Sequence, residues 1–425
     1  MSPTTRPPLV IPDFSPSISS LKESCNAIQQ AITQYENAGT DSSRSTALEA
    51  IQNTSNTFSK LVKNPTEIIA DLTFRLNLNF ASRIAIEMGL YTSLPKDNSY
   101  ISLADLAKAT NATEEFTLRI ARLLASFDFI KQQYTANDPK ENPQYAHAFT
   151  SRVLTTSPGI AGSKFCFDTL HRSAFAAIPS FYTKHGFRSP QHSTNTVFSH
   201  AHGTSSQGFF EILEQRPAEL AVFNEAMRSE ARLTMGGLLG LYPFGELVGN
   251  AEGVVLVDVG GGKGHSLVEI CRQRPELEGK VVLQDLQRVL DGGVLVDKEK
   301  TGLMGYDFFS EVQPIKGSNY FFKRIFHDWP EEECKTILRN LAPSMCPTSK
   351  LLICDTLIHD EKPDPLLLLR DISMMTMGGK ERSLRQWSEL LGSEGFRIKR
   401  TFKDAKCRDV DILEVVFEGV DGARL

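Results

Sequence analysis

The chain has 425 residues, of which 41% are hydrophobic and 23% are charged, and its formal net charge is -5. This length exceeds a single usual hydrophobic core, so two domains are expected, and the composition is that of an ordinary globular protein. The mild negative charge gives no support for nucleic acid or an anionic membrane surface as a partner, and no apolar stretch is long enough to span a bilayer.

The N-terminus and the cysteines indicate the cellular compartment. Residues 1–12 lack the apolar segment of a secretory signal, so we expect a cytoplasmic protein. The seven cysteines are dispersed and form no C-x-x-C pair, which predicts reduced structural thiols and no metal site. They are Cys25, Cys166, Cys271, Cys334, Cys346, Cys354 and Cys407.

The N-terminal region is predicted to be helical. Residues 1–15 are rich in Pro, Ser and Thr and are expected to be loosely ordered, and helices are predicted near 18–37 and 45–62. Over residues 67–89 an apolar residue recurs every fourth position, so this helix is expected to pack against another helix. The stripe consists of Ile68, Leu72, Leu76, Phe80, Ile84 and Met88.

A winged helix-turn-helix pattern follows. Capped helices are predicted to start near Ser102 and Thr113, and residues 129–134 and 145–149 are predicted to form the two strands of a wing. The exposed side of the second helix mixes Glu and Arg, whereas a DNA-recognition helix needs basic and amide groups. A scaffold for packing and dimerisation is therefore favoured, and a DNA-binding regulator is the remote alternative.

Residues 150–249 are predicted to be mainly helical and are rich in aromatic residues. Aromatic side chains in such a stretch more often pack in the hydrophobic core than line a ligand pocket. Because this stretch links two domains, where ligand pockets tend to form, we expect some of them to face a flat apolar substrate. The candidates are Phe165, Phe223 and Met227.

The chain is organised around residues 254–265, VVLVDVGGGKGH. Four consecutive apolar residues predict a strand buried on both faces of a parallel sheet. Gly260, Gly262 and Gly264 then permit positive φ and close approach of a ligand, and the following helix offers unpaired N–H groups. The run indicates a nucleotide-like ligand, with a tight turn that serves only packing as the alternative.

The details of this run count against a dinucleotide or P-loop nucleotide site. His265 stands where a dinucleotide fingerprint has its third glycine, and no phosphate-binding P-loop pattern is present. A second strand, residues 281–284, ends in Asp285, where an acidic residue would accept hydrogen bonds from ribose hydroxyls. A nucleoside without pyrophosphate suggests S-adenosylmethionine.

Further strands are predicted over residues 319–326 and 351–354. Ligands of α/β sheets bind beyond the carboxyl ends of the strands. We therefore expect Asp285, Asp307, His327 and Asp355 on one rim of the sheet.

Several motifs occur in a fixed order: VDVGGGKG, QDL at 284–286, YDFF, FKRIFHDWPEEE, the Asp355 segment, GGKERS at 378–383 and EGFRIKR at 394–400. From about Ile68 to the C-terminus the chain resembles the S-adenosylmethionine-dependent small-molecule O-methyltransferases of the plant caffeate/flavonoid type and their fungal secondary-metabolism relatives. The resemblance implies an α/β fold with two domains. A helical and winged-helix dimerisation domain is expected over 1–155, and a Rossmann-like class I methyltransferase domain over 156–425, with 156–250 contributing to the substrate pocket.

The resemblance also implies residue roles and partners. It implies a homodimer that uses S-adenosylmethionine, releases S-adenosylhomocysteine and binds a small aromatic metabolite, without a metal, nucleic acid or membrane partner. His327 matches the catalytic base, and Asp355 and Glu381 match the two acidic residues that hold it; in many members the first of these is Glu. Met374 and Met375 match substrate-binding positions. The implied cofactor-binding residues are Gly260, Gly262, Gly264, Asp285, Leu286, Asp307, Phe308 and Lys323.

The chemistry agrees with these roles. A phenol has a pKa near ~10, so little phenolate exists at neutral pH, and an imidazole with a reference pKa near ~6.5 is suited to take the proton. The carboxylates would orient His327 and stabilise its imidazolium, as the acid of a catalytic triad does.

Each assignment has an alternative. Asp328 is interpreted as the N-cap of the helix that Pro330 begins, in preference to a catalytic role. Asp355 would otherwise cap a turn, Glu381 would pair with Lys380 or Arg382, and the methionines would be ordinary core. The main functional alternative is an enzyme of this fold that keeps the cofactor but catalyses a pericyclic or dehydration reaction. The intact histidine favours methyl transfer.

Overall fold

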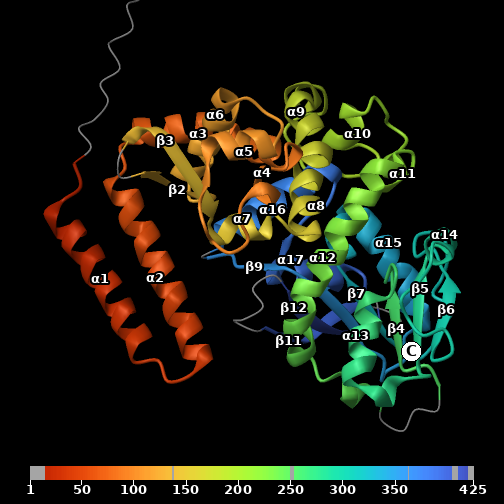
Figure 1. Ribbon diagram of the computed structural model, residues 1–425. Coiled ribbons are helices and arrows are strands. Elements are labelled where there is room, and N and C mark those ends of the chain that lie inside the picture. Colours follow the sequence, from red (N-terminus) through yellow and green to blue (C-terminus); the bar gives the residue numbers. More distant parts are fainter. Residues whose placement is uncertain (1–14, 136–137, 249–252, 362, 404–409, 420–425) are drawn as a thin grey trace, which may run out of the picture. The chain divides into compact units, whose positions relative to one another are not determined.

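The computed structural model describes residues 15–135, 138–248, 253–361, 363–403 and 410–419 (Figure 1). The chain divides into two compact units, residues 1–148 and 149–425. The expected boundary at 155/156 lies slightly later, between helices α7 (Phe149–Val153) and α8 (Ser157–Lys164). Among the described residues, no helix combines the length and the apolar character that crossing a bilayer requires.

The first unit combines a helical hairpin with a winged-helix element. Helices α1 and α2 pack side by side (Figure 1), and α2 begins at Asp41 because Thr40 and Ser43 form a capping box there. Ser102 and Thr113 cap α5 and α6, as predicted. The elements are α1 (Ile18–Glu36), α2 (Asp41–Val62), α3 (Pro65–Glu87), α4 (Leu90–Ser93), β1 (Ile101–Ser102), α5 (Leu103–Ala109), α6 (Glu114–Ser126), β2 (Ile130–Thr135) and β3 (Asp138–His147).

The predicted wing is present as a three-stranded antiparallel sheet in the order β1-β3-β2. Its register pairs Ile130 with His147. Strand β3 begins at Asp138, well before the predicted residue 145, and residue 149 already belongs to helix α7.

The apolar stripe of α3 differs from the expectation. The buried residues of this helix are Leu78, Ala81, Ser82 and Ala85, whose mostly small side chains allow close packing within the unit. Four of the six stripe residues instead point outward, with Leu72 74% exposed, whereas Leu76 and Met88 are half-buried. Helix α3 does pack against α6 and α4, as expected, but within the described part of this unit the four exposed residues of the stripe are not covered by a helix.

The second unit is built on a seven-stranded sheet in the order β11-β12-β8-β7-β4-β5-β6. Strands β4 to β8 run parallel to one another, β12 runs antiparallel to β8, and β11 runs antiparallel to β12. The seven strands of this sheet are β4 (Leu256–Val259), β5 (Val281–Asp285), β6 (Thr301–Gly305), β7 (Asn319–Lys323), β8 (Leu351–Asp355), β11 (Phe396–Phe402) and β12 (Asp411–Phe417). A separate two-stranded parallel sheet consists of β9 (Leu357–Ile358) and β10 (Arg382–Ser383).

Helices surround this sheet and precede it in the chain. The helices after α8 are the π-helix η1 (Phe165–His171), α9 (Arg172–His185), α10 (Val197–Ala201), α11 (Phe209–Glu214), α12 (Pro217–Leu241), the 3-10 helix η2 (Phe244–Leu247), α13 (His265–Gln273), η3 (Pro275–Leu277), α14 (Gln287–Asp291), η4 (Phe326–Asp328), α15 (Glu331–Leu341), η5 (Ala342–Ser344), α16 (Pro365–Met377) and α17 (Leu384–Ser393). The predicted helical stretch at 150–249 is confirmed for its described residues.

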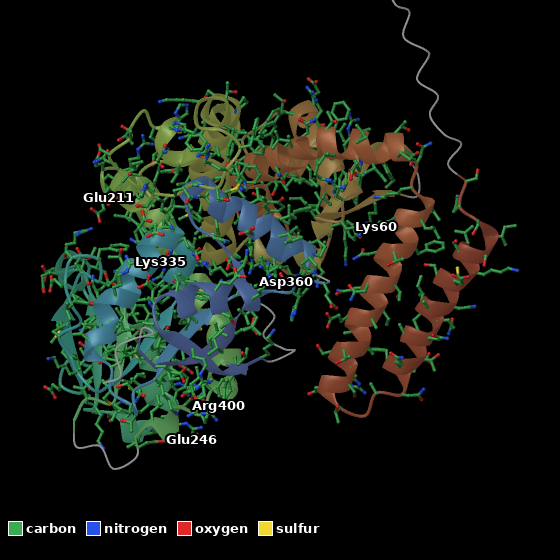
Figure 2. The ribbon with its side chains drawn as sticks, turned by 180° about the vertical axis from the view of Figure 1, so that it is seen from behind. Lys60, Glu211, Glu246, Lys335, Asp360 and Arg400 are labelled. Carbon is green, nitrogen blue, oxygen red and sulfur yellow. The ribbon has the colours of Figure 1, made fainter. Side chains whose placement is uncertain are left out.

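Alternate residues of the central strands pack into two hydrophobic cores, one on each face of the sheet. Val257 and Phe322 pack on one face of the sheet with residues of α15 and α17, and Leu256 and Phe321 pack on the other face with residues of α13. This burial on both faces explains why the strands read as continuous apolar runs. Charged side chains such as Glu246 and Arg400 lie at the outside of the unit (Figure 2).

The cysteines of the described ranges form no disulfide bond, and Cys407 lies outside those ranges. Burial raises the pKa of Cys334 to about 12, so this thiol stays protonated at neutral pH. Within the same ranges, no group of His, Cys, Asp and Glu side chains has an arrangement that would hold a metal ion.

Candidate active site

The predicted polar residues meet at one rim of the sheet. Asp285 ends β5, Asp307 follows β6, His327 follows β7 and Asp355 ends β8. Because these strands belong to one parallel array, their carboxyl ends lie on the same edge. The expectation that these four side chains share a rim is confirmed.

The glycine loop after β4 has the predicted left-handed backbone. Gly260, Gly262 and Gly264 have φ values of 70°, 60° and 82°. A Cβ atom would lie 2.5 Å from Ile325 Cδ1 at Gly260 and 2.5 Å from Val296 Cγ1 at Gly264, whereas at Gly262 it would meet nothing within 4 Å. Packing therefore requires two of the glycines, and Gly262 opens onto free space that a ligand could use.

Asp285 holds this loop in place. Its Oδ2 accepts a hydrogen bond of 2.8 Å from the Gly262 N–H, and its Oδ1 accepts one of 2.8 Å from the Leu286 N–H. Burial raises the pKa of Asp285, although the two hydrogen bonds oppose this rise. A carboxylate accepts several hydrogen bonds, so lone pairs remain for a ligand hydroxyl.

The loop after β6 is organised by Asp307. Its oxygens accept hydrogen bonds from the Phe309 N–H at 2.9 Å and from Ser310 Oγ at 2.8 Å. The Phe308 ring lies beside the glycine loop, with its Cε1 3.6 Å from the position of a Cβ on Gly260. The aromatic ring of Phe308 thus lies beside the glycine loop, and Asp307 organises the neighbouring loop after β6.

Asp258 is a candidate site residue that the sequence analysis did not assign. It is 1% exposed, and its Oδ2 has no hydrogen-bond partner among the described residues. Burial raises the pKa of Asp258 to about 7; Lys323 opposes this shift and Asp285 adds to it. The available signal was an acidic residue at the end of an apolar strand, directly before the glycine run.

His327 lies in the short helix η4, immediately after β7. Its Nδ1 is 3.0 Å from Glu381 Oε1, and its Nε2 is 3.5 Å from Asp328 Oδ1. A carboxylate accepts, so Nδ1 carries the proton in the neutral ring and Nε2 is the atom that can take another. The sequence prediction of a His–Glu pair therefore has a matching geometry.

The surrounding charges make His327 a stronger base than free imidazole. Burial alone would lower the pKa of His327, but Glu381, then Asp328, and finally Asp355 raise it to about 9. Burial likewise opposes ionisation of Glu381, yet His327 and Arg324 hold the pKa of this carboxyl below its usual value. Without ligands, the pair is mainly imidazolium and carboxylate at neutral pH.

Asp355 differs from its expected role. It is 2% exposed, and neither of its oxygens accepts a hydrogen bond from a described residue. Burial raises the pKa of Asp355 to about 7, and His327 opposes this shift. Asp355 therefore influences His327 through charge, whereas Glu381, with its longer side chain, makes the hydrogen bond.

The predicted N-cap role of Asp328 is wrong. Helix α15 begins at Glu331 with Pro330 at its N-cap position, and no side chain caps it. Trp329 is extended, with φ -119° and ψ 141°, which separates Asp328 from the first turn. The carboxylate of Asp328 faces the His327 ring instead.

Besides His327, Glu381 has a second basic neighbour, Arg324, which the sequence analysis did not predict. Arg324 Nη1 lies 3.8 Å from Glu381 Oε1 and donates a 2.7 Å hydrogen bond to Thr356 Oγ1. Arg324 adopts φ 57°, a left-handed conformation that costs a non-glycine residue about 1–2 kcal/mol. This backbone reversal ends β7 at Lys323, earlier than the predicted residue 326, and it starts the turn that carries His327.

Four of the five predicted substrate residues share one apolar cluster: Phe165, Phe223, Met227 and Met374. The Phe165 and Phe223 rings are 5.3 Å apart between centroids, and Phe210 of the same cluster is 5.6 Å from Trp329 in the His327 turn. Met375, the fifth, is not a member of this cluster. The cluster is therefore continuous with the turn that holds the candidate base.

Comparison with known proteins identifies the family. Residues 184–397 match the model of the O-methyltransferase domain, and residues 71–157 match that of the O-methyltransferase dimerisation domain. The chain belongs to the O-methyltransferase family. It is an S-adenosylmethionine-dependent enzyme of the secondary-metabolism type, which confirms the resemblance found in its motifs. The winged-helix region belongs to the dimerisation domain, as the favoured interpretation held.

Individual relatives support this assignment. The chain is 30% identical to the O-methyltransferase afvC of Aspergillus flavus over 81% of this chain and 82% of the relative. The crystal structure of OxaC in complex with SAH and oxaline has a TM-score of 0.80 and 21% identity, covering 94% of this chain and 99% of OxaC. A pericyclic reaction enzyme has a TM-score of 0.75 and 23% identity, covering 93% and 99% of the two chains. These two structures confirm the predicted α/β fold with its N-terminal helical domain.

Proposed function

We propose that this enzyme methylates a phenolic hydroxyl of an aromatic secondary metabolite, with His327 as the general base. The observation that carries the proposal is the 3.0 Å contact between His327 Nδ1 and Glu381 Oε1, which directs the basic lone pair to Nε2. When bound, S-adenosylmethionine would supply an electrophilic methyl group on its sulfonium, and the neutral thioether S-adenosylhomocysteine would be the leaving group.

The protein residues would then accept and stabilise the proton that leaves the acceptor hydroxyl. The acceptor hydroxyl would donate its proton to His327 Nε2, and Glu381 would stabilise the imidazolium at Nδ1. With the pKa of His327 raised to about 9, the base approaches the pKa of a phenol, ~10, so the transfer is nearly balanced. The apolar cluster of Phe165, Phe223, Met227 and Met374 is suited to hold a flat ring beside this turn; we keep Met375 as a further candidate from the family resemblance.

The rim is suited to hold the cofactor. The open space at Gly262, the orphaned oxygen of buried Asp258 and the Asp285 carboxylate are features that a nucleoside with a charged amino-acid tail would satisfy. We assign the ribose hydroxyls to Asp285, and the adenine to the loop of Asp307 and Phe308. The proposed cofactor-binding set is Gly260, Gly262, Gly264, Asp285, Leu286, Asp307, Phe308 and Lys323.

Replacing Asp285 by alanine is expected to weaken binding of S-adenosylhomocysteine about 10- to 100-fold, because hydrogen bonds to charged groups are worth about 1.5–3 kcal/mol. Isothermal titration calorimetry with the full chain measures this change directly. Asp360→Ala, at an exposed position (Figure 2), is the control and should leave the affinity unchanged. Equal affinity of Asp285→Ala and the parent would remove Asp285 from the cofactor site.

The overall reaction is tested with methyl-labelled cofactor and a panel of phenols, each paired with its own methyl ether. Label should enter the phenols and not the ethers, at a stoichiometry of one S-adenosylhomocysteine per product. Conversion of an acceptor without incorporation of label would instead support the non-methylating alternative.

We also propose that the enzyme is a homodimer that covers the outward-facing stripe of α3, which lies largely in the matched dimerisation domain. Sedimentation should give twice the chain mass of 47.2 kDa. Leu72→Glu places a charge in the stripe and should shift the enzyme toward monomer, whereas Lys60→Glu on α2 should not. A monomeric parent would contradict the proposal.

A further inference from the structure

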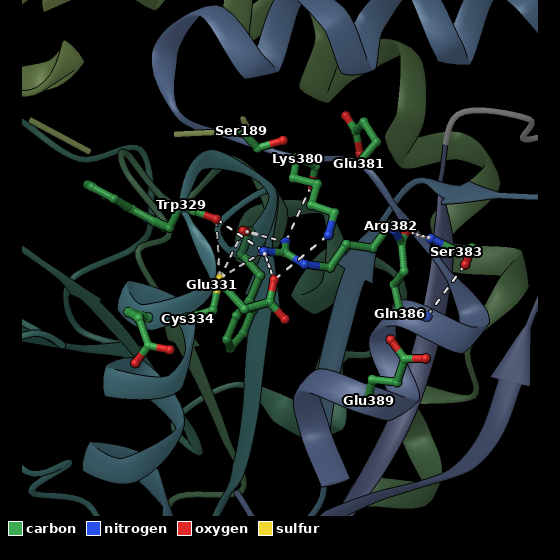
Figure 3. Close-up of polar contacts among 12 residues, drawn as sticks. Ser189, Trp329, Glu331, Cys334, Lys380, Glu381, Arg382, Ser383, Gln386 and Glu389 are labelled. Atoms are coloured by element: carbon green, nitrogen blue, oxygen red, sulfur yellow. Dashed lines mark hydrogen bonds and ion pairs between the residues drawn. The ribbon is translucent and has the colours of Figure 1, made fainter. Parts of the chain in front are cut away.

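The fold buries a guanidinium group directly behind the His327 turn. Arg382 is 1% exposed, and it extends from β10 toward Trp329, Cys334 and Glu331 (Figure 3). Buried charges normally need a close partner of opposite charge. The carboxylate of Glu331 is 3.5 Å from Nη2 and its side chain is 37% exposed, so this ion pair is long and partly screened by solvent.

The principal contacts of Arg382 are backbone carbonyls. Nη1 donates to the Phe326 carbonyl at 3.0 Å, and Nη2 donates to the Trp329 carbonyl at 3.1 Å. These two residues flank His327 and Asp328, so the planar guanidinium spans both ends of the turn. The Cys334 Sγ lies 3.3 and 3.4 Å from the same two carbonyl oxygens, and its single S–H donates to one of them at a time.

The neighbours of Arg382 in sequence hold the same turn. The Lys380 N–H donates a 2.8 Å hydrogen bond to the His327 carbonyl, and a Cβ on Gly379 would come within 2.3 Å of that oxygen. Glu381 supplies the contact with His327 Nδ1. The segment 379–382 thus contacts the backbone of His327, its ring and the two ends of its turn.

We propose that Arg382 is a positioning residue that fixes the turn 326–329 and thereby keeps His327 against Glu381. The proposal rests on the proposed role of His327 as the base. Two backbone hydrogen bonds lie within the turn, from Asp328 N to Ile325 O at 3.1 Å and from Trp329 N to Phe326 O at 3.3 Å, and Arg382 adds contacts that tie its two ends to β10. A lysine would keep the charge but present a compact ammonium that does not reproduce the planar fork, so Arg and Lys are not equivalent here.

The test compares Arg382→Met and Arg382→Lys with the parent in the full chain. We expect kcat to fall about 10²-fold in Arg382→Met, the loss typical of a base displaced by about 1 Å, with S-adenosylhomocysteine affinity unchanged. The kcat of Arg382→Lys should lie between that of Arg382→Met and that of the parent. Arg385→Met removes an exposed arginine of the next helix, which pairs with Glu389 at 3.0 Å, and should change neither value.

The decisive readout is the titration of His327, followed by NMR of histidine-labelled protein. If Arg382 positions the ring, the pKa of His327 falls from about 9 toward the ordinary 6.5 in both variants, because the distance to Glu381 increases. If Arg382 only stabilises the fold, folded variants titrate like the parent, and that result overturns the proposal. Should Arg382→Met fail to fold, an unchanged His327 titration in Arg382→Lys overturns it equally.

This readout is independent of catalysis. If His327→Ala methylates as fast as the parent, the assignment of the base fails, while the NMR titration still reports whether Arg382 holds the turn. The failure of each proposal is therefore distinguishable from the failure of the other.

Discussion

The His327→Ala variant is expected to methylate a phenol about 10²- to 10⁴-fold more slowly than the parent, which is the usual contribution of a general base. The loss should appear in kcat, because Nε2 would act on the proton that leaves the acceptor and not on the cofactor. Initial rates with methyl-labelled S-adenosylmethionine measure it, together with calorimetric binding of S-adenosylhomocysteine, which should be unchanged.

Two controls sharpen this result. His359→Ala removes an exposed histidine and should retain the parental rate. An acidic phenol that is already ionised at the assay pH needs no base, so His327→Ala should lose much less activity with that acceptor. Equal losses with ionised and un-ionised phenols would point to a structural defect, and a variant as fast as the parent would exclude His327 as the base.

The Glu381→Gln variant is expected to lower the maximal rate about 10²-fold and to move the pH profile to lower pH. In the parent, with the pKa of His327 raised to about 9, only about 1% of the imidazole is neutral at pH 7, so the rate should rise about tenfold per pH unit up to about 9. Removing the carboxylate charge lowers the pKa of His327 toward 6.5, so the rate of the variant should level off earlier, at a lower plateau.

This variant separates two explanations of the parental profile. A rate that follows spontaneous ionisation of the phenol also rises with pH, but its profile would not shift when Glu381 changes. The control is Glu389→Gln, an exposed carboxylate on α17, which should keep both rate and profile. A Glu381→Gln profile that rises in parallel with that of the parent would contradict the base mechanism.

The same pKa shift has a consequence for stability. Because the pKa of His327 is raised in the folded state, its interactions with the neighbouring carboxylates, first of all Glu381, stabilise the fold fully below the unfolded pKa of about 6.5, and this contribution is lost as the pH rises through about 9. The whole pKa shift corresponds to about 3 kcal/mol, at about 1.36 kcal/mol per pKa unit, and the part that Glu381 supplies is smaller. Unfolding of the parent and of Glu381→Gln should therefore differ most near pH 6 and converge near pH 10.

Local patterns were sufficient for the framework of the enzyme. Continuous apolar runs predict the strands of a parallel sheet, glycines at 260, 262 and 264 predict a left-handed loop, and polar residues at strand ends predict a common rim. Each of these features depends on residues close together in the chain, where backbone geometry and periodicity act directly. The motif series then indicated the family, and its matched histidine and glutamate do lie in hydrogen-bond contact.

Contacts between distant residues were not encoded in any such pattern. His327 meets Glu381 across 54 positions of sequence, and only the packing of β10 beside the turn decides that Glu381, rather than Asp355, makes the hydrogen bond. The same packing turns Asp328 toward the histidine instead of the helix, and it places Arg382 on carbonyls that no sequence pattern identifies as acceptors. Electrostatics and backbone hydrogen bonding at this site depend on distances of a few ångströms, and those distances arise only when the whole sheet assembles.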